Sequence, residues 1–166
     1  MSQNIEKEQS LLASLKSKVG DAATELYVNP KRIKVFTDSA RIVAVAKAVR
    51  ELGFDQVMSV GGTDFPKEDV FALDYHLISV GNDDLMKIIF NLSTKIPRKE
   101  PKISSLISVW QSVEYHEQET FEMLGIMFEG HPRMERLLLP EDWDDIPPLR
   151  KEFQLPGRVR EHGSSR

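Results

Sequence analysis

The densest group of polar side chains in the sequence lies between residues 114 and 122, where carboxylates surround one imidazole. Its members are Glu114, His116, Glu117, Glu119 and Glu122. Such a group could bind a metal or supply paired carboxylates for acid–base catalysis. A zinc-hydrolase helix, however, carries two histidines one turn apart around a glutamate, and this segment has His116 alone. We therefore expect neither a bound metal nor a catalytic residue here.

A stand-alone metal-dependent hydrolase using His116, His131 and the helix glutamates is kept as a hypothesis of a different class. It predicts that the isolated protein retains stoichiometric metal and loses it when the histidines are replaced. His131 precedes Pro132, so it could be a proton donor, a partner contact or a hydrogen-bonded turn residue. The turn is the favoured interpretation.

The same glutamates also suit a structural network with the C-terminal segment. Glu119 and Glu122 are three residues apart and share a helix face. They could meet cations from further along the chain, namely Arg133, Arg136, Arg150 and Lys151. Arginine pairs with a carboxylate through two parallel hydrogen bonds, although exposed pairs contribute only about 0–1 kcal/mol. We predict that these pairs hold the C-terminal segment in one shape.

Several other classes of site are excluded by composition. The chain has no cysteine, which excludes disulfides, thiolate-bound clusters and thiol nucleophiles. Gly61-Gly62-Thr63 lacks the spacing and the lysine of a phosphate-binding loop, and no GxGxxG is present. The net charge is −4 and no basic stripe occurs, so nucleic acid is a poor candidate partner. We expect no cofactor in this chain.

The helices that must position these residues are indicated by apolar periodicity and by glycine stops. A first helix is expected from about residue 5 to 19, ending at Gly20. A second is expected from Ser39 to Leu52 with Asp38 as its cap. The third, from Ser112 to Leu124, carries the glutamates and ends at Gly125.

Five strands are expected between and after the first two helices. The proposed strands are Glu25–Val28, Arg32–Thr37, Gln56–Val60, Val70–Val80 and Leu85–Ile96. The first two would form a hairpin around Asn29-Pro30. Connections beginning at Gly61-Gly62 and at Gly81–Asp84 are too short for helical crossovers, which predicts an antiparallel meander.

These elements predict an α+β fold, in which a mostly antiparallel sheet is flanked by helices and followed by an extended, irregular C-terminal tail. The expected units are an α+β domain over 1–108, an amphipathic helix and exit strand over 109–128, and a Pro/Arg-rich docking tail over 129–166. Residues 95–102 read as an exposed connection or a docking loop. The N-terminus lacks a secretory signal and no apolar run approaches a membrane span, so we expect a cytosolic protein without direct membrane insertion.

The segment from Glu117 to Gly157 resembles the signature region of the 30 kDa subunit of respiratory complex I, the NADH:quinone oxidoreductase. The matching residues are Glu117, Glu119, Glu122, Leu124-Gly125-Ile126, Phe128, Gly130-His131-Pro132, Arg136-Leu137-Leu138 and Pro148-Leu149-Arg150-Lys151-Glu152-Phe153. The motifs occur in the family's order and cover about a quarter of the chain.

This resemblance implies an accessory subunit without a redox cofactor, which packs against the large hydrogenase-like (49 kDa-like) subunit. A nickel–iron centre, iron–sulfur clusters, or both would then be held by partner subunits. Iron–sulfur subunits and, indirectly, integral membrane antiporter-like subunits are the other expected partners. The chain would lie on the cytoplasmic side of the membrane, peripheral through complex assembly.

The sequence departs from the family's common pattern at three places. Gln118 stands where arginine is usual, Leu124 where phenylalanine is usual, and Asp145-Ile146-Pro147 where a second glycine-histidine is usual. With the short stretch after Gly157, these departures favour a ferredoxin-driven membrane-bound hydrogenase or a sulfur-reducing relative coupled to ion pumping. The 30 kDa subunit of a quinone-reducing complex I is the alternative, and a soluble adaptor unrelated to membranes is a third.

In this hypothesis the candidate residues fix the tail or touch the partner, and none performs bond chemistry. The residues expected to fix the tail are Glu117, Glu119, Glu122, Arg136, Arg150 and Lys151. The expected contacts are His131, Trp143 and Phe153, with Pro132 and Leu149 as further interface or structural residues. Aromatic and arginine residues are enriched at interface hot spots.

Overall fold

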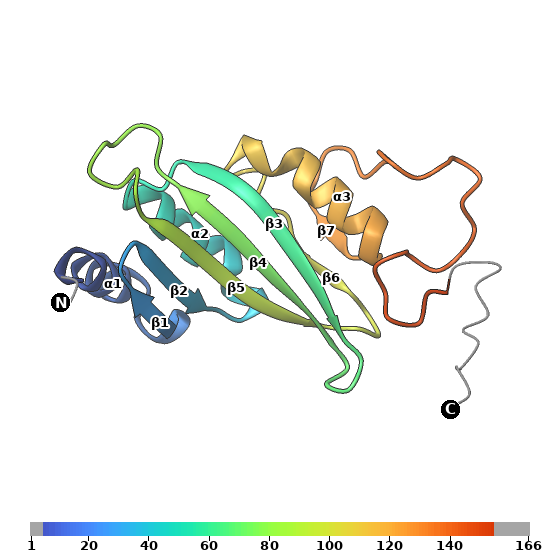
Figure 1. Cartoon of the computed structure of the whole chain (residues 1–166), viewed down its shortest axis with the longest axis horizontal. Coiled ribbons are helices and arrows are strands. Elements are labelled where there is room, and N and C mark those ends of the chain that lie inside the picture. The colour runs from blue at the N-terminus through green and yellow to red at the C-terminus, as the bar shows by residue number, and fades with distance from the viewer. Residues whose placement is uncertain (1–4, 155–166) are drawn as a thin grey trace, which may run out of the picture.

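A five-stranded sheet with helices packed on one face forms the body of the protein (Figure 1). The computed structural model describes residues 5–154, so the part of the predicted tail from 155 to 166, with Gly157, lies outside the described residues. The helices are α1 (Glu6–Val19), α2 (Ile42–Glu51) and α3 (Glu114–Leu124), with 3₁₀ turns η1 (Gly20–Ala22), η2 (Ser39–Arg41) and η3 (Gln111–Val113). The strands are β1 (Thr24–Asn29), β2 (Arg32–Phe36), β3 (Gln56–Phe65), β4 (Val70–Ile78), β5 (Ile89–Pro97), β6 (Lys102–Ser104) and β7 (Met127–Glu129). The expected α+β class is confirmed.

The strand order in the main sheet is β1-β2-β5-β4-β3. The hairpin β1–β2 and the meander β3–β4–β5 are antiparallel as predicted. One junction differs, because β2 pairs with β5 in parallel. A second, two-stranded sheet pairs β6 with β7, also in parallel. Both parallel pairs join segments distant in sequence, so no local pattern could have indicated them.

Two expected strand boundaries were wrong. Strand β3 continues through Gly61-Gly62 to Phe65, where a connection had been expected to begin. The segment from Leu85 to Ile88 belongs to the β4–β5 connection instead of β5, because the Leu85 and Met86 amides both bond the Asn82 carbonyl in a turn. The connection at 95–102 is correspondingly shorter, since β5 runs to Pro97 and β6 begins at Lys102.

The predicted helix cap at Asp38 was also wrong in detail. Its side chain makes no capping hydrogen bond, and the chain enters α2 through η2, where the Arg41 amide bonds the Asp38 carbonyl at 2.9 Å. The predicted stop of α3 is confirmed, because Gly125 has the left-handed φ of 76°. Glycine adopts this conformation without the steric penalty that a Cβ atom would bring. That stop turns the chain into β7 and from there into the tail.

The helices cover the apolar side of the sheet and enclose one core. The largest fully buried side chains include Trp110, Phe54 and Phe90, and the Trp110 indole donates to the Phe54 carbonyl at 2.9 Å. Helix α3 packs against β3, where a Cβ on Gly62 would lie 2.3 Å from Leu124 Cδ1. This close approach explains why the glycine lies inside a strand.

Gly62→Ala is therefore expected to destabilise the protein by about 1–3 kcal/mol, since the added methyl must displace the buried Leu124 side chain. Gly61→Ala is the matched control, because the nearest atom to its added Cβ is the Asp74 carbonyl oxygen at 4.0 Å. Urea titrations of the two variants give the free energies of unfolding that test this prediction. Equal stability of the two variants would contradict this account of the α3–β3 packing.

Within residues 5–154, no helix is both long enough and apolar enough to span a bilayer.

Candidate docking site on α3 and the tail

Helix α3 places Glu117, Glu119 and Glu122 in two different environments. Glu117 and Glu122 are buried, whereas Glu119 is exposed. Gln118 is buried as well, and its side-chain amide donates to the Arg133 carbonyl at 2.9 Å. The helix is therefore polar on a face that is covered by other parts of the chain. The apolar periodicity that predicted this helix accounts for only part of that covered face.

Glu117 is wholly buried and joins α3 to the segment that follows β6. Its carboxylate accepts hydrogen bonds from the Leu106 amide at 2.9 Å and the Ser105 hydroxyl at 2.5 Å. The Tyr75 hydroxyl lies at 3.5 Å. Burial raises the pKa of Glu117 to about 7, and the three hydrogen bonds limit the rise by stabilising the charged form. Burial, together with the nearby carboxylate, also raises the pKa of Tyr75 well above its usual value.

Glu122 anchors the tail through the backbone. Its two carboxylate oxygens accept from the Leu138 amide at 2.8 Å and the Leu139 amide at 2.6 Å. The expected arginine partners for Glu119 and Glu122 were wrong, because no ion pair within residues 5–154 includes either glutamate. In an irregular tail, many backbone amides have no hydrogen-bond partner within a helix or a sheet. The buried carboxylate of Glu122 accepts hydrogen bonds from two such amides at once.

His131 organises the turn into the tail. Its Nδ1 accepts from the Arg133 amide at 3.1 Å, so Nε2 carries the proton and donates to the Glu114 carbonyl at 3.1 Å. The Arg133 guanidinium also pairs with the Glu114 carboxylate at 3.1 Å. Pro132 is exposed at the same corner. The geometry is that of the favoured interpretation, a hydrogen-bonded turn residue.

Arg136 closes a loop in the tail. Its guanidinium donates to the carbonyls of Pro140, Glu141 and Trp143 at 3.0, 2.8 and 2.5 Å. The Trp143 indole donates to the Asp145 carbonyl at 3.0 Å, and its ring lies 5.7 Å from the Phe153 ring. Arg136 therefore bonds backbone carbonyls of the tail and not the carboxylates that were expected as its partners.

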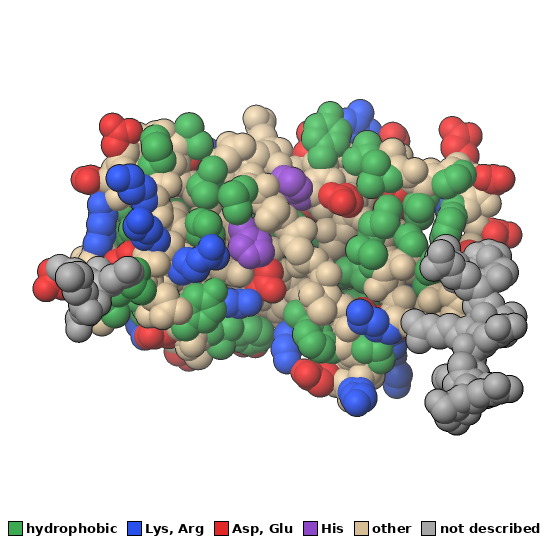
Figure 2. Space-filling model, viewed as in Figure 1, with side chains coloured by type: hydrophobic (Ala, Val, Ile, Leu, Met, Phe, Trp, Pro, Cys, Tyr) green, Lys and Arg blue, Asp and Glu red, His purple; other side chains and the backbone are tan. Residues whose placement is uncertain are grey.

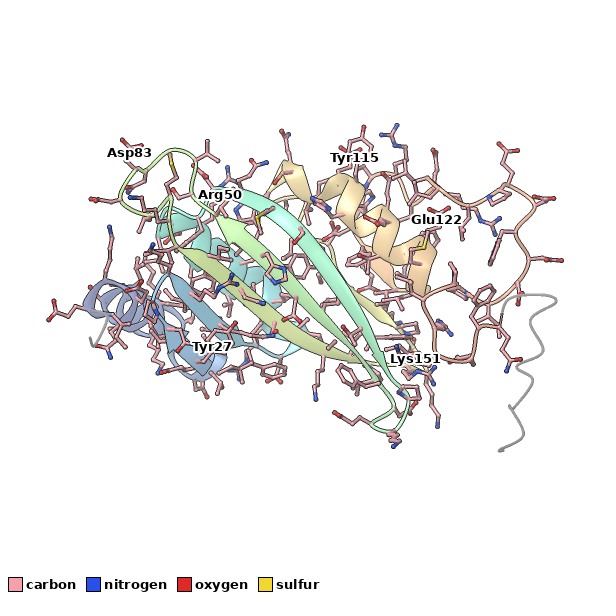
Figure 3. All side chains as sticks on the ribbon, in the orientation of Figure 1. Tyr27, Arg50, Asp83, Tyr115, Glu122 and Lys151 are labelled. Carbon is pink, nitrogen blue, oxygen red and sulfur yellow. The ribbon has the colours of Figure 1, made fainter. Side chains whose placement is uncertain are left out.

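The returning end of the tail is held by Asp64 and Arg98, which were not candidates in the sequence. Asp64, with a fully buried side chain, accepts from Arg98 Nε at 2.8 Å and from the Lys151 amide at 2.9 Å. Arg98 also pairs with Glu152 at 2.6 Å. Asp64 and Lys151 are 87 positions apart, so only the folded sheet brings them together. Figure 3 shows Lys151 where the tail meets the end of the sheet.

Arg150 packs beside the Asp64–Arg98 ion pair, called here the Asp64–Arg98 clamp, and its side chain faces inward. Its Nε donates to the Leu124 carbonyl at 2.7 Å, and its guanidinium carbon lies 5.3 Å from the centre of the Phe71 ring. The carbonyl it satisfies is one of those left open at the end of α3. Lys151, by contrast, contributes only its amide, and its side chain is exposed.

The tail nevertheless exposes large apolar side chains. Leu138 is 61% exposed and Leu149 is 57% exposed, although both lie next to tightly bonded backbone. Leu137, Ile146 and, on α3, Tyr115 are exposed as well. Figure 3 shows Glu122 on α3 next to this part of the tail. The arrangement is a fixed backbone that presents side chains outward, which suits binding to another protein.

The arrangement offers little for catalysis. Across the described residues, no three or more potential ligands among histidine, aspartate and glutamate are placed to hold a metal ion. Both ring nitrogens of His131 are hydrogen-bonded to backbone groups.

A family model described as "Respiratory-chain NADH dehydrogenase, 30 Kd subunit" matches residues 35–159 of the chain. The chain is 32% identical over 154 residues to a subunit of the F(420)H(2) dehydrogenase of Methanosarcina mazei, covering 91% of this chain and 95% of the relative. It is 39% identical over 127 residues to a subunit of the NADH-quinone oxidoreductase of Roseiflexus sp. strain RS-1, covering 74% and 70%.

Two solved structures share the fold. One is a chain of the membrane-bound sulfane sulfur reductase, an archaeal respiratory membrane complex, with a TM-score of 0.80, 22% identity and coverage of 90% of this chain and 87% of that chain. The other is the trypsin-resistant fragment of Nqo5, with a TM-score of 0.63, 21% identity and coverage of 76% and 98%.

Proposed function

The chain belongs to the family of the 30 kDa subunit of respiratory-chain NADH dehydrogenase, and from this premise we propose that α3 and the tail dock it onto the large hydrogenase-like subunit of its complex. The chain is a subunit of a complex I-like oxidoreductase complex, and no catalytic site is indicated in it. In this proposal it acts as a scaffold, while the nickel–iron centre, the iron–sulfur clusters, or both belong to neighbouring chains.

The observation that carries the proposal is the pairing of buried anchors with exposed leucines. Glu122 is 5% exposed, yet it holds the amide of Leu138, whose own side chain is 61% exposed. A surface that is held in one conformation loses less entropy when it binds than a flexible one does. A tail held in this way, with apolar side chains turned outward, is suited to a permanent interface between subunits.

The same proposal includes the location and the division of the chain. In this proposal residues 1–108 are the α+β domain, 109–128 complete it and 129–166 are the docking tail, of which 155–166 lie outside the described residues. Through the large subunit the chain would contact iron–sulfur subunits and, indirectly, integral membrane antiporter-like subunits. It would lie peripherally on the cytoplasmic side of the membrane.

For the reaction of the whole complex, our first candidate is ferredoxin-driven hydrogen evolution or sulfur reduction coupled to ion pumping. The departures at Gln118, Leu124 and Asp145-Ile146-Pro147 support it. The second candidate is quinone reduction, which is favoured by the similarity to the NADH-quinone oxidoreductase of Roseiflexus. Both candidates place the chemistry outside this chain.

The test is purification of the complex through a tag on the full-length chain after mild detergent extraction. We expect the large subunit and integral membrane subunits to co-purify with it. Stoichiometric nickel would indicate a hydrogenase, whereas iron without nickel would indicate a sulfur- or quinone-reducing complex. Recovery of the chain alone would overturn the proposal.

A pair of variants locates the interface in the same experiment. Leu137→Ser/Leu138→Ser removes the exposed leucines of the tail, and we expect it to reduce recovery of the large subunit by about 10-fold or more. Leu26→Ser, which changes a 52% exposed leucine on β1, is the control and should retain full recovery. Unchanged recovery with the tail variant, or equal losses with both variants, would contradict docking through the tail.

A further inference from the structure

We propose that residues 135–146, called here the acidic loop, bind a surface of the partner protein that has an apolar centre and a rim of lysine and arginine. The inference rests on the proposed function and adds the chemistry of the partner. It comes from the distribution of charge along the tail and from the way the loop is held.

The acidic loop accounts for the net negative charge of the protein. Its acidic residues are Glu135, Glu141, Asp142, Asp144 and Asp145, and its one basic residue is Arg136. The resulting formal charge of −4 equals that of the whole chain, so the other residues together are neutral. All five carboxylates lie on exposed residues. A cluster of this kind attracts a cationic surface from a distance.

Nothing in the described part of the chain neutralises these carboxylates with a cation. No ion pair within residues 5–154 includes any of them. The Asp145 carboxylate accepts one hydrogen bond, from the Ile146 amide at 2.6 Å. The Arg136 guanidinium is directed at the loop's own carbonyls, with two of its hydrogen bonds at 3.0 and 2.8 Å. Arg136, the one cation of the loop, thus bonds backbone carbonyls within the loop and not its carboxylates. The carboxylates remain on exposed residues.

The same loop also exposes apolar side chains. Leu137 is 45% exposed, Leu138 is 61% exposed and Ile146 is 39% exposed. In Figure 2 hydrophobic side chains gather over α3 and the tail, with acidic side chains along the outer rim. An apolar centre within a polar rim is the usual anatomy of a protein interface. The partner that fits it presents apolar side chains where the leucines meet it and cations around them.

The loop already has a defined shape in the free chain. Glu122 bonds the Leu138 and Leu139 amides, and Arg136 bonds the carbonyls across the loop. The backbone that carries the charges is therefore held in one conformation, which favours electrostatic steering of the encounter over slow folding on the partner. Association should accordingly be fast and should slow when salt is added.

The test uses the complex purified from cells that lack this chain, to which the full chain is added back while the association rate is measured. We expect the rate to fall by about 10-fold or more between low and high ionic strength. The charge-reversal variant Glu141→Lys/Asp142→Lys should associate about 10-fold more slowly at low salt and lose most of the salt dependence. It leaves the Glu141 backbone carbonyl in place for Arg136.

The matched control is Asp83→Lys/Asp84→Lys, which reverses two adjacent charges on the β4–β5 connection at the other end of the molecule (Figure 3). It should associate like the wild type. Association that is independent of salt and unaffected by the loop reversal would overturn the acidic-loop inference while leaving docking intact. Failure of the wild-type chain to rejoin the complex would instead overturn the proposed function. Self-association of the isolated chain that the loop reversal abolishes would make a second copy the occupant, and would also overturn the inference.

Discussion

Replacing Glu122 with glutamine is expected to release the tail from α3 while leaving the sheet domain folded. The carboxylate accepts from two backbone amides, at 2.8 and 2.6 Å. A glutamine has one acceptor oxygen, so its NH₂ group would face the second amide, and donor would meet donor. With about 1.5–3 kcal/mol for each hydrogen bond to a charged group, the local stability of the tail should fall by about 3 kcal/mol.

Amide hydrogen exchange measures this loss directly. The Leu138 and Leu139 amides should exchange about 100-fold faster in Glu122→Gln, because local opening is favoured by about 3 kcal/mol. Amides of β4 and β5 should be unaffected. Glu119→Gln, an exposed change three residues earlier on the same helix, should alter neither set. Unchanged protection of the two leucine amides would show that the carboxylate does not hold the tail.

The Glu122 anchor also shows what the sequence could and could not reveal about the site. The glutamate was a candidate from the sequence, because its spacing from Glu119 on a predicted helix suggested partners in the tail, and in the structure it bonds the Leu138 and Leu139 amides. Its partners were predicted wrongly, since side-chain pairing with arginine follows from residue types, whereas bonding to the Leu138 and Leu139 amides depends on the path of the tail. A backbone partner leaves no signal in the sequence.

The same distinction between local features and long-range contacts separates the parts of the fold that could be predicted from those that could not. Helix ends at Gly20 and Gly125 were predicted because a glycine stop is a local feature of the chain. The parallel pairing of β2 with β5 and the Asp64–Arg98 clamp on the tail were not, because they join segments far apart in sequence. Gly61-Gly62 was misassigned for a related reason, since the glycine that looked like a turn residue was required by the approach of Leu124.

Glu117 is expected to make the stability of the protein depend on pH near neutrality. Burial raises its pKa from the ordinary value of 4.5 to about 7, so the folded state binds a proton that the unfolded state has already released over this interval. The contribution of Glu117 to the free energy of unfolding is therefore expected to fall as the pH rises from about 4.5 to about 7 and to level off above it. A shift of this size corresponds to a loss of about 3 kcal/mol.

The variant Glu117→Gln isolates this contribution. Glutamine copies the protonated acid, because its oxygen can accept from the Leu106 amide while its NH₂ donates to the Ser105 hydroxyl oxygen. Wild type and variant should have similar stability near pH 5. Above pH 7 the variant should be the more stable by about 3 kcal/mol, since it carries no buried charge. Urea titrations at several pH values give the difference curve.

The exposed residue Glu119 again supplies the control, because Glu119→Gln removes one charge from the same helix without removing a buried one. Its difference from the wild type should stay nearly constant from pH 5 to pH 8. A flat difference curve for Glu117→Gln would show that the buried carboxyl does not take up a proton near neutrality. If instead the wild type becomes less stable than Glu117→Gln as the pH rises to 7, the protonation of one buried acid stabilises α3, the helix to which the tail is bonded.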